Sequence, residues 1–536
     1  MHLENELSLS EFADFEIEAA PDDTPSDADR QRQFVAALIG SASLALGLVG
    51  NVLLYANPVG INLLLYVAVG LGVAFGLLRY LRHPVAVHHA AFAVPALIFA
   101  GLLGVRLAPQ LVLFNFAAMT GSLLVVIHFT GTPLFLGGRW SEPLKRTLET
   151  LVTGWMKSLR AVLPDSLRWF GQTELNNRQV TTLRSVLRGA LIALPVAAVF
   201  TMLLSSADLV FADAATDALL FFLPDNAPSV VGQAMTIAFL TMVALTGYYT
   251  LLRDWEERED VPMPGKPGRL RLNIIEASTV LGSINVLFVA FVGIQARYFF
   301  GGEANITAQG YTYADYARRG FYELLAVSCM TMLLLIVLES LTYRKREEEK
   351  VFRALVALMV GLTFVILAAA FQRLALYESA YGYTRVRVMS GTFMIWLALL
   401  LGALLVAILR HRPIVFTVAC VVTAMGFVLT LNVINLDGFI ARHNIARFED
   451  TGRLDVPYLL SLSDDAIPTV AALIDDPALD VFEREQLLDG LRARLAALDV
   501  DRDERGLLSY HAGTSRAWRA LDERRDVLKS DLTIFK

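Results

Sequence analysis

Apolar residues dominate eleven long stretches of the chain, and shorter polar segments separate each stretch from the next. A helix needs about 20 mostly apolar residues to cross a membrane, and each of these stretches is long enough to do so. The pattern therefore predicts an all-α polytopic membrane protein with about eleven transmembrane helices. The predicted spans are residues 34–56, 59–80, 86–106, 109–129, 185–206, 229–252, 274–298, 318–342, 352–376, 388–409 and 413–434.

The segments outside the spans predict the remaining domain organisation. Residues 1–33 are acidic and polar and lack the basic start and apolar core of a secretory signal, so we expect a disordered tail. Residues 435–536 mix Leu, Ala, Asp and Arg at helical spacing, which predicts a small soluble helical region. Between them, residues 34–130 form a first group of spans, 131–184 a loop and 185–434 a second group.

The loop 131–184 contains a second kind of helical pattern. From Pro143 to Phe170, leucines and a tryptophan recur every three or four residues, and basic residues such as Lys157 and Arg160 lie off that row. Such a helix can lie flat on the cytoplasmic surface of the membrane, with its apolar side in lipid and its basic groups toward anionic headgroups. Packing against neighbouring helices is the alternative.

Composition and charge agree with a membrane class. Hydrophobic residues make up 55% of the 536 residues, more than soluble folding needs. The net charge of −6 comes largely from the N-terminal tail, and no basic domain is present, so we expect no nucleic-acid partner. Cys329 and Cys420 both lie in apolar stretches, where we expect them to be packing residues.

The distribution of Lys and Arg predicts the orientation in the cell membrane. Cytoplasmic loops retain positive charge, and here alternate loops are the basic ones. With an odd number of spans, the N-terminus is then cytoplasmic and the C-terminal region extracytoplasmic. The basic loops carry Arg79 and Arg82; Arg139, Lys145 and Arg146; Arg253, Lys266, Arg269 and Arg271; Arg344, Lys345, Arg346 and Lys350; and Arg410 and Arg412.

Motifs for known chemistry do not occur in the sequence. No histidine has a partner at zinc spacing, and there is no GxSxG elbow, HExxH motif or dinucleotide fingerprint. The sequence therefore predicts no metal, no cofactor and no catalytic residue. This weighs against an enzyme without excluding one.

Arginines and tyrosines gather on the predicted outer face, where short loops normally avoid arginine. Guanidinium groups bind phosphate or carboxylate through two parallel hydrogen bonds, and tyrosine suits the membrane interface. The cluster predicts either a site for an anionic lipid headgroup or envelope polymer, or a structural latch in which arginines pair with carboxylates. Its members are Arg297, Arg318, Arg319, Glu323, Arg373, Tyr381, Arg385, Arg387 and Asp437.

The second half of the chain carries a family resemblance. The stretches LALYESAYGYTRVRVMSGTFMIWLAL, NLDGFIARHNIARF and LDVPYLLSLSDDAIPTV resemble the bacterial polytopic membrane protein family known as domain of unknown function 4173. The resemblance covers the chain from about Leu272 onward and implies an integral membrane protein with a C-terminal helical segment, but no activity. The residues that match the family's characteristic positions are Tyr381, Gly382, Thr384, Arg385, Asn435, Asp437, Ala441 and Asn444.

Two of these stretches predict a contact. Asn435 and Asp437 directly follow the last span, where the chain needs a turn or cap. Gly382 stands where the Tyr/Arg loop turns. Because both segments fall on the same membrane face in the predicted topology, we expect them to touch, with Arg385 or Arg387 near Asp437.

Three functions remain open. The first is a binding, scaffold or signalling component of the cell envelope that contacts the lipid bilayer and a protein partner, the latter through its C-terminal region. The second is a transporter or lipid-handling protein, which would need polar residues near the bilayer midplane. The third is a membrane transferase acting on a lipid-phosphate substrate, for which Glu323, Glu378 and Asp437 are the candidate bases.

Overall fold

The described part of the protein is helical. A computed structural model shows no β-strand among the residues it describes, only an isolated bridge between Leu272 and Thr342. This confirms the all-α class. The described residues are 26–83, 85, 87–129, 150–171, 227–252, 272–300, 320–342, 349–504 and 506–529.

Nine helices within these residues are long and apolar enough to cross a membrane. Their bounds agree closely with the spans that hydropathy predicts, because a continuous apolar run can satisfy its backbone in lipid only as a helix. They are α1 (Asp27–Leu54), α2 (Ile61–Tyr80), α5 (Pro109–Phe129), α10 (Ala227–Leu252), α11 (Ile274–Phe300), α14 (Phe321–Leu341), α15 (Glu349–Tyr381), α16 (Arg385–Leu409) and α17 (Pro413–Ile434).

Two predicted spans differ from this set. The span at 185–206 lies outside the described residues. The span at 86–106 contains two shorter helices, α3 (Val87–Ala90) and α4 (Ala93–Leu102). The chain nevertheless returns from the last residue of α2 to the level of its first, since a Cβ placed on Gly104 would lie 3.1 Å from the carbonyl carbon of Gly60, which precedes α2.

Helix bounds also differ at two places. The helix α1 begins at Asp27, inside the segment 1–33 that composition predicts as a tail, and residues 1–25 lie outside the described part. The stretch Tyr377–Arg387 is not a long loop, because α15 continues through Tyr381 and α16 starts at Arg385. Only residues 382–384 connect these two helices.

The chain divides into two compact units, Met1–Leu44 with Met156–Pro228, and Ala45–Trp155 with Ser229–Lys536. In the first, α7 (Trp155–Gly171) follows the π-helix η2 (Thr150–Gly154) and packs on α1. The rings of Phe34 and Trp169 meet edge-on, with centroids 5.2 Å apart. Three members of the apolar row that the sequence predicts, Trp155, Leu159 and Leu163, are exposed, and Leu167 and Phe170 further along α7 are exposed as well.

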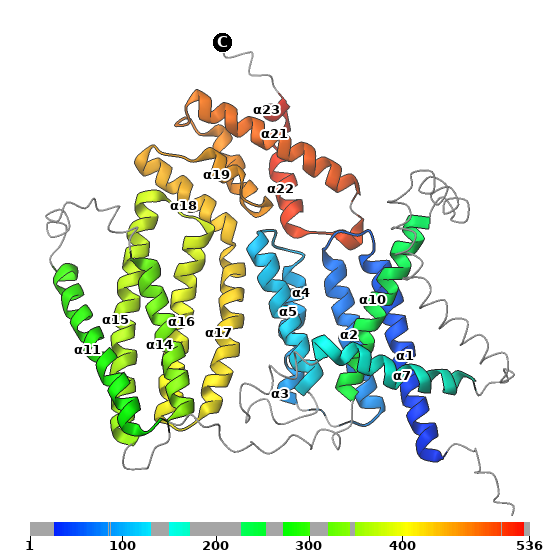
Figure 1. Cartoon of the computed structure of the whole chain (residues 1–536). Helices are drawn as coiled ribbons and strands as arrows, with labels where there is room; N and C mark the ends of the chain where they lie inside the picture. The colour runs from blue at the N-terminus through cyan, green and yellow to red at the C-terminus, as the bar shows by residue number, and fades with distance from the viewer. Residues whose placement is uncertain are drawn as a thin grey trace, which may run out of the picture. The chain divides into compact units, whose positions relative to one another are not determined.

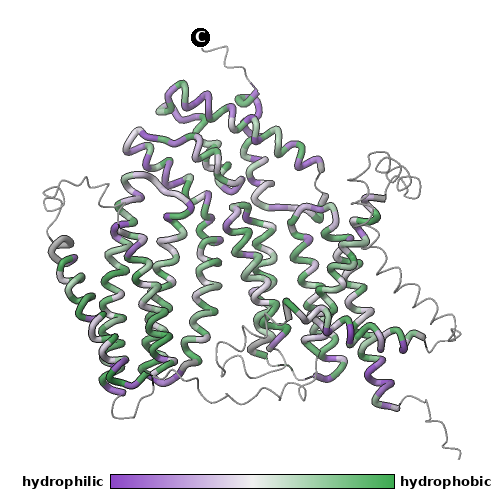
Figure 2. Tube along the Cα trace, viewed as in Figure 1, coloured by the Kyte–Doolittle hydropathy of each residue, from purple (hydrophilic) through white to green (hydrophobic). Residues whose placement is uncertain are grey.

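The second unit contains two groups of spanning helices. Helices α11, α14, α15, α16 and α17 share one apolar core, and α2, α4 and α5 share another. Helix α17 packs against α5 and joins the two groups (Figure 1). Figure 2 shows that these helices are predominantly hydrophobic along their length and more polar near their ends.

The helices after α17 form a domain that we call the C-terminal cap, residues 435–529. Its buried core is continuous with the ends of the spanning helices, since Leu111 of α5 and Leu431 of α17 belong to the same cluster as Ile440 and Leu487 of the cap. The cap thus packs directly on the spanning helices of its own unit (Figure 1). It comprises α18 (Leu436–Thr451), α19 (Val456–Leu460), η4 (Asp464–Ala466), α20 (Ile467–Ala471), η5 (Ala472–Asp475), α21 (Val481–Glu504), η6 (Leu507–Ser509), α22 (Ala512–Asp522) and α23 (Arg525–Lys529).

Candidate functional site

Of the two arginines that the sequence places near Asp437, Arg385 makes the contact and Arg387 does not. Arg385, the first residue of α16, donates two hydrogen bonds to Asp437 in the first turn of α18, from Nε to Oδ1 at 2.8 Å and from Nη2 to Oδ2 at 2.7 Å. The Asp437 side chain is 0% exposed, and its Oδ2 also accepts the backbone N–H of Ser463 at 2.8 Å. Both oxygens of this buried carboxylate are therefore satisfied, which repays much of the cost of burying its charge.

The connection between α15 and α16 is held by one asparagine of the cap. Asn444 accepts the backbone N–H of Tyr383 at 2.7 Å and donates to the carbonyl of the same residue at 2.9 Å. The turn requires glycine at residue 382, where φ is +79°, and a Cβ there would lie 2.7 Å from the Oδ1 of Asn444. The loop and the cap segment that the sequence predicts to meet are thus in direct contact.

Further arginines are directed at this same connection. Arg387 donates to the carbonyls of Tyr381 and Gly382, and its guanidinium lies 3.9 Å from the ring centroid of Tyr377. Arg447 of α18 donates to two carbonyls at the end of α15. These carbonyls belong to the last turn of a helix, where no intrahelical donor is available. The arginines therefore cap α15 as well as joining it to its neighbours.

The other members of the predicted cluster are placed less closely. Arg373 lies on α15 with its guanidinium against Gly320, which precedes α14. Glu323 is exposed in the first turn of α14. Arg297 lies on α11 near the end of that helix, without a described side chain, and Arg318 and Arg319 lie outside the described residues.

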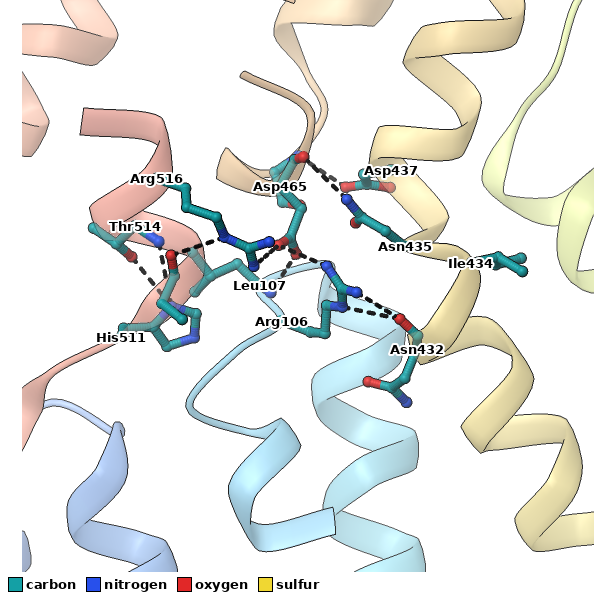
Figure 3. Close-up of polar contacts among 12 residues, drawn as sticks. Arg106, Leu107, Asn432, Ile434, Asn435, Asp437, Asp465, His511, Thr514 and Arg516 are labelled. Atoms are coloured by element: carbon teal, nitrogen blue, oxygen red, sulfur yellow. Dashed lines mark hydrogen bonds and ion pairs between the residues drawn. The ribbon is translucent and has the colours of Figure 1, made fainter. Parts of the chain in front are cut away.

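A second buried carboxylate was not predicted from the sequence. Asp465 in η4 accepts the backbone N–H of Leu107 at 2.8 Å, and its Oδ1 lies 3.5 Å from Nη1 of Arg106 and 4.0 Å from Nη2 of Arg516 (Figure 3). Arg106 also donates two hydrogen bonds to the carbonyl of Asn432 at the end of α17. This cluster joins α17, the α4–α5 connection and the cap.

The electrostatics of this second cluster reflect incomplete pairing. The Asp465 side chain is 1% exposed, and among the described residues its Oδ1 accepts no hydrogen bond. Burial raises the pKa of Asp465 above its usual value, against the opposing effects of the Leu107 N–H and the Arg106 charge. Burial likewise lowers the pKa of Arg106. Both partners are therefore held in an environment that disfavours their charges.

A signal for Arg106 does exist in the sequence. Arg106 stands at the predicted outer end of an apolar stretch. Arginine is as unusual there as at the positions of the predicted cluster of arginines and tyrosines. Asp465 gives no such signal, because an acidic pair before an apolar run is also a common helix start, and η4 begins at that pair. Its partner Arg106 is far away in the sequence.

The arrangement as a whole holds elements together. Arg385, Arg387, Arg447 and Arg106 all contact carbonyls or carboxylates of this chain. Among the described residues, no group of three or more His, Cys, Asp or Glu side chains could hold a metal ion. In the described residues, these arginines therefore hold the spanning helices to one another and to the cap.

One family model matches the part of the chain that contains these contacts. The model of a domain of unknown function, DUF4153, matches residues 89–473, which include both buried carboxylates and their partners Arg385 and Arg106. The chain belongs to the DUF4153 family. No curated protein sequence and no solved structure matches it.

The DUF4153 match corrects the resemblance drawn from the sequence. Domain of unknown function 4173 is not the family found. The three stretches that suggested it lie within the DUF4153 match, which also extends far into the first half of the chain. Polytopic families share apolar runs and interface tyrosines for the same physical reasons, so short stretches of this kind separate such families poorly.

Proposed function

We propose that this DUF4153 member is a binding or scaffold component of the cell envelope whose C-terminal cap is a fixed platform on the spanning helices. One observation carries the proposal: two arginines of the predicted anionic site, Arg385 and Arg387, bind groups of this chain itself. Arg385 pairs with the buried Asp437, and Arg387 donates to carbonyls and lies over the ring of Tyr377. Asp437, a candidate base for a transferase, likewise has both oxygens engaged.

The proposal includes an orientation with the cap outside the cell. Arg79 lies in the last turn of α2 and Arg82 just after it, and Arg410 and Arg412 follow α16. Helices α2 and α16 both begin at the cap, so these four basic residues lie at the opposite ends of the spans. Cytoplasmic ends retain positive charge, which favours a cytoplasmic N-terminus and an extracytoplasmic cap.

A partner-binding surface of the cap can be tested at Val481 and Phe482. These first residues of α21 are strongly exposed, and α21 begins in the part of the cap away from the spanning helices (Figure 1). Exposed adjacent apolar side chains on a water-facing domain suit a protein partner. Val500 near the other end of α21 is also exposed and serves as a matched control.

The experiment compares complex sizes in mild detergent extracts of cells by native electrophoresis. We expect the wild type and Val500→Ser to migrate in a larger complex than the purified protein. The double variant Val481→Ser/Phe482→Ser should migrate as the purified protein does while retaining the wild-type melting temperature. A wild type that migrates no more slowly than the purified protein, or a double variant that stays in the large complex, would contradict the proposal.

The orientation is tested by labelling with a membrane-impermeant thiol reagent in cells, in a background of Cys329→Ala and Cys420→Ala. Phe482→Cys in the cap should react in intact cells, whereas Arg410→Cys should react only after permeabilisation. The reverse pattern would place the cap in the cytoplasm.

A further inference from the structure

The loop before α22 brings apolar side chains of the cap to the end of two spanning helices. Leu507 is 93% exposed, and Leu508 and Tyr510 are also exposed. We call Leu507, Leu508 and Tyr510 the apolar loop. Neighbouring exposed apolar side chains on a domain that has its own buried core form a contiguous apolar surface, and such surfaces mark contacts with a partner or a membrane.

The backbone of this loop is docked on the turn between α1 and α2. The carbonyl of Tyr510 accepts the N–H of Ile61, the first residue of α2, at 3.2 Å. The hydroxyl of Ser509 donates to Asn57 in the same turn at 3.4 Å. A Cβ on Gly60 would lie 2.5 Å from the Tyr510 carbonyl oxygen, so the approach is as close as two backbones allow.

A second contact fixes the other side of the loop. The N–H of Ala512 donates to the carbonyl of Gly104, just after α4, at 2.9 Å. Residues 510 and 512 are thus bound to the start of the spanning helix α2 and to the residues just after the shorter helix α4. The loop cannot move away from these ends without breaking backbone hydrogen bonds.

The length of α2 sets the depth of the loop. Helix α2 has 20 residues, and at about 1.5 Å per residue it spans about 30 Å, the thickness of the hydrocarbon layer. Its first residue therefore lies at the boundary between hydrocarbon and headgroups. Because Tyr510 is hydrogen-bonded to that residue, the apolar loop lies at the same level.

The neighbouring surface is apolar as well. Val52 at the end of α1, Val59 in the turn and Ile61 at the start of α2 are all exposed. The apolar loop continues this lipid-facing surface onto the cap. Tyrosine at this depth is also typical of the membrane interface, where its ring is apolar and its hydroxyl reaches water.

We propose that the apolar loop inserts into the headgroup region of the bilayer and is a direct lipid-binding anchor of the C-terminal cap. The preceding end of α21 carries Asp501 and Asp503, so attraction to anionic lipid does not drive the contact. Burial of apolar area drives the contact, so insertion should persist in uncharged lipid and at high salt.

The test places an environment-sensitive fluorophore at single cysteines of the full-length protein, in the Cys329→Ala/Cys420→Ala background, in phosphatidylcholine vesicles. Leu507→Cys reports on the apolar loop. Val52→Cys, 67% exposed on α1, is the lipid-facing control, and Phe482→Cys, 72% exposed on the cap, is the water-facing control. All three sites are exposed, so the label should not disturb packing.

Quenching by lipids with a spin label near the headgroup decides the result. We expect quenching at Leu507→Cys to match that at Val52→Cys and to exceed that at Phe482→Cys at least twofold, and to be the same in 0.1 M and 1 M salt. Quenching at Leu507→Cys no greater than at Phe482→Cys would overturn the proposal. Quenching that appears only with anionic lipid and is lost in salt would overturn it too, because it would indicate an electrostatic contact.

Discussion

Two buried carboxylates of the cap face arginines from outside the cap, Arg385 at the start of α16 and Arg106 between α4 and α5, and they differ in how well they are paired. Asp437 receives two short hydrogen bonds from Arg385 and one from a backbone N–H. Asp465 lies 3.5 Å from Arg106, and its Oδ1 accepts no hydrogen bond among the described residues. A buried ion pair stabilises a fold only when its geometry repays desolvation. The first junction therefore fastens the cap, whereas the second adds little stability.

The largest effect is expected for Asp437→Asn. The amide group cannot accept from both nitrogens of Arg385, so the variant leaves a partly buried guanidinium without its counter-charge. Loss of one partner of a buried pair costs about 3–5 kcal/mol. We expect the free energy of unfolding in detergent to fall by this amount. A loss below about 1 kcal/mol would mean that the pair does not fasten the cap.

A smaller effect is expected for Gly382→Ala, which tests the fit of the same junction. Its control is Gly452→Ala, because both glycines have positive φ, +79° and +64°, but a Cβ at Gly452 meets open space. The left-handed backbone alone costs about 1–2 kcal/mol for alanine. Gly382→Ala should cost more than its control in thermal unfolding, since Asn444 must also move. Equal costs would show that the Asn444 contact is not tight.

The variant Asp465→Asn should change stability least among these substitutions. Its amide oxygen can still accept the N–H of Leu107, and Arg106 keeps its two hydrogen bonds to the Asn432 carbonyl. Removal of a costly buried charge offsets the loss of its attraction to Arg106. We expect a change within about 1 kcal/mol of the wild type, measured as for Asp437→Asn. A loss as large as that of Asp437→Asn would make the two junctions equivalent.

The smallest expected effect is the pH dependence of the stability that Asp465 contributes. The pKa of Asp465 is raised by burial, so the folded protein holds this proton more tightly than the unfolded chain does. Stability from this group is present below the ordinary value of 3.8 and is lost as pH rises through the higher folded-state pKa. Relative to Asp465→Asn, the wild type should therefore lose stability as pH rises above 3.8. A gain over that range would contradict the assigned cause.

The sequence predicts the spanning helices well because their signal is local. An apolar run such as that of α17 must be helical in lipid, and its predicted bounds, 413–434, agree with Pro413–Ile434. A contact of Arg385 or Arg387 with Asp437 was predictable because both segments fall on the same membrane face in the predicted topology, where an arginine violates the charge rule and so indicates a partner. The same rule applied to Arg106 would have indicated a second site.

The remaining features depend on tertiary contacts that leave no local pattern. The docking of residues 509–512 on the α1–α2 turn and on Gly104 joins backbone groups from opposite ends of the chain, and any residue type can supply such groups. The role of Asp465 likewise depends on Leu107 and Arg106. Helix α7 shows the same limit, since its apolar row was visible but its buried contact with α1 through Ser166 was not.

The most direct test of the account is a pair of double-mutant cycles in thermal unfolding, one on Arg385 and Asp437 and one on Arg106 and Asp465, each with alanine substitutions. Direct contacts of this kind couple by about 0.5–3 kcal/mol. The account predicts coupling near the top of that range for Arg385 with Asp437, and less than half as much for Arg106 with Asp465. Coupling between Arg385 and Asp437 that is no larger than that of the second pair would contradict the claim that this junction fastens the cap to the spanning helices.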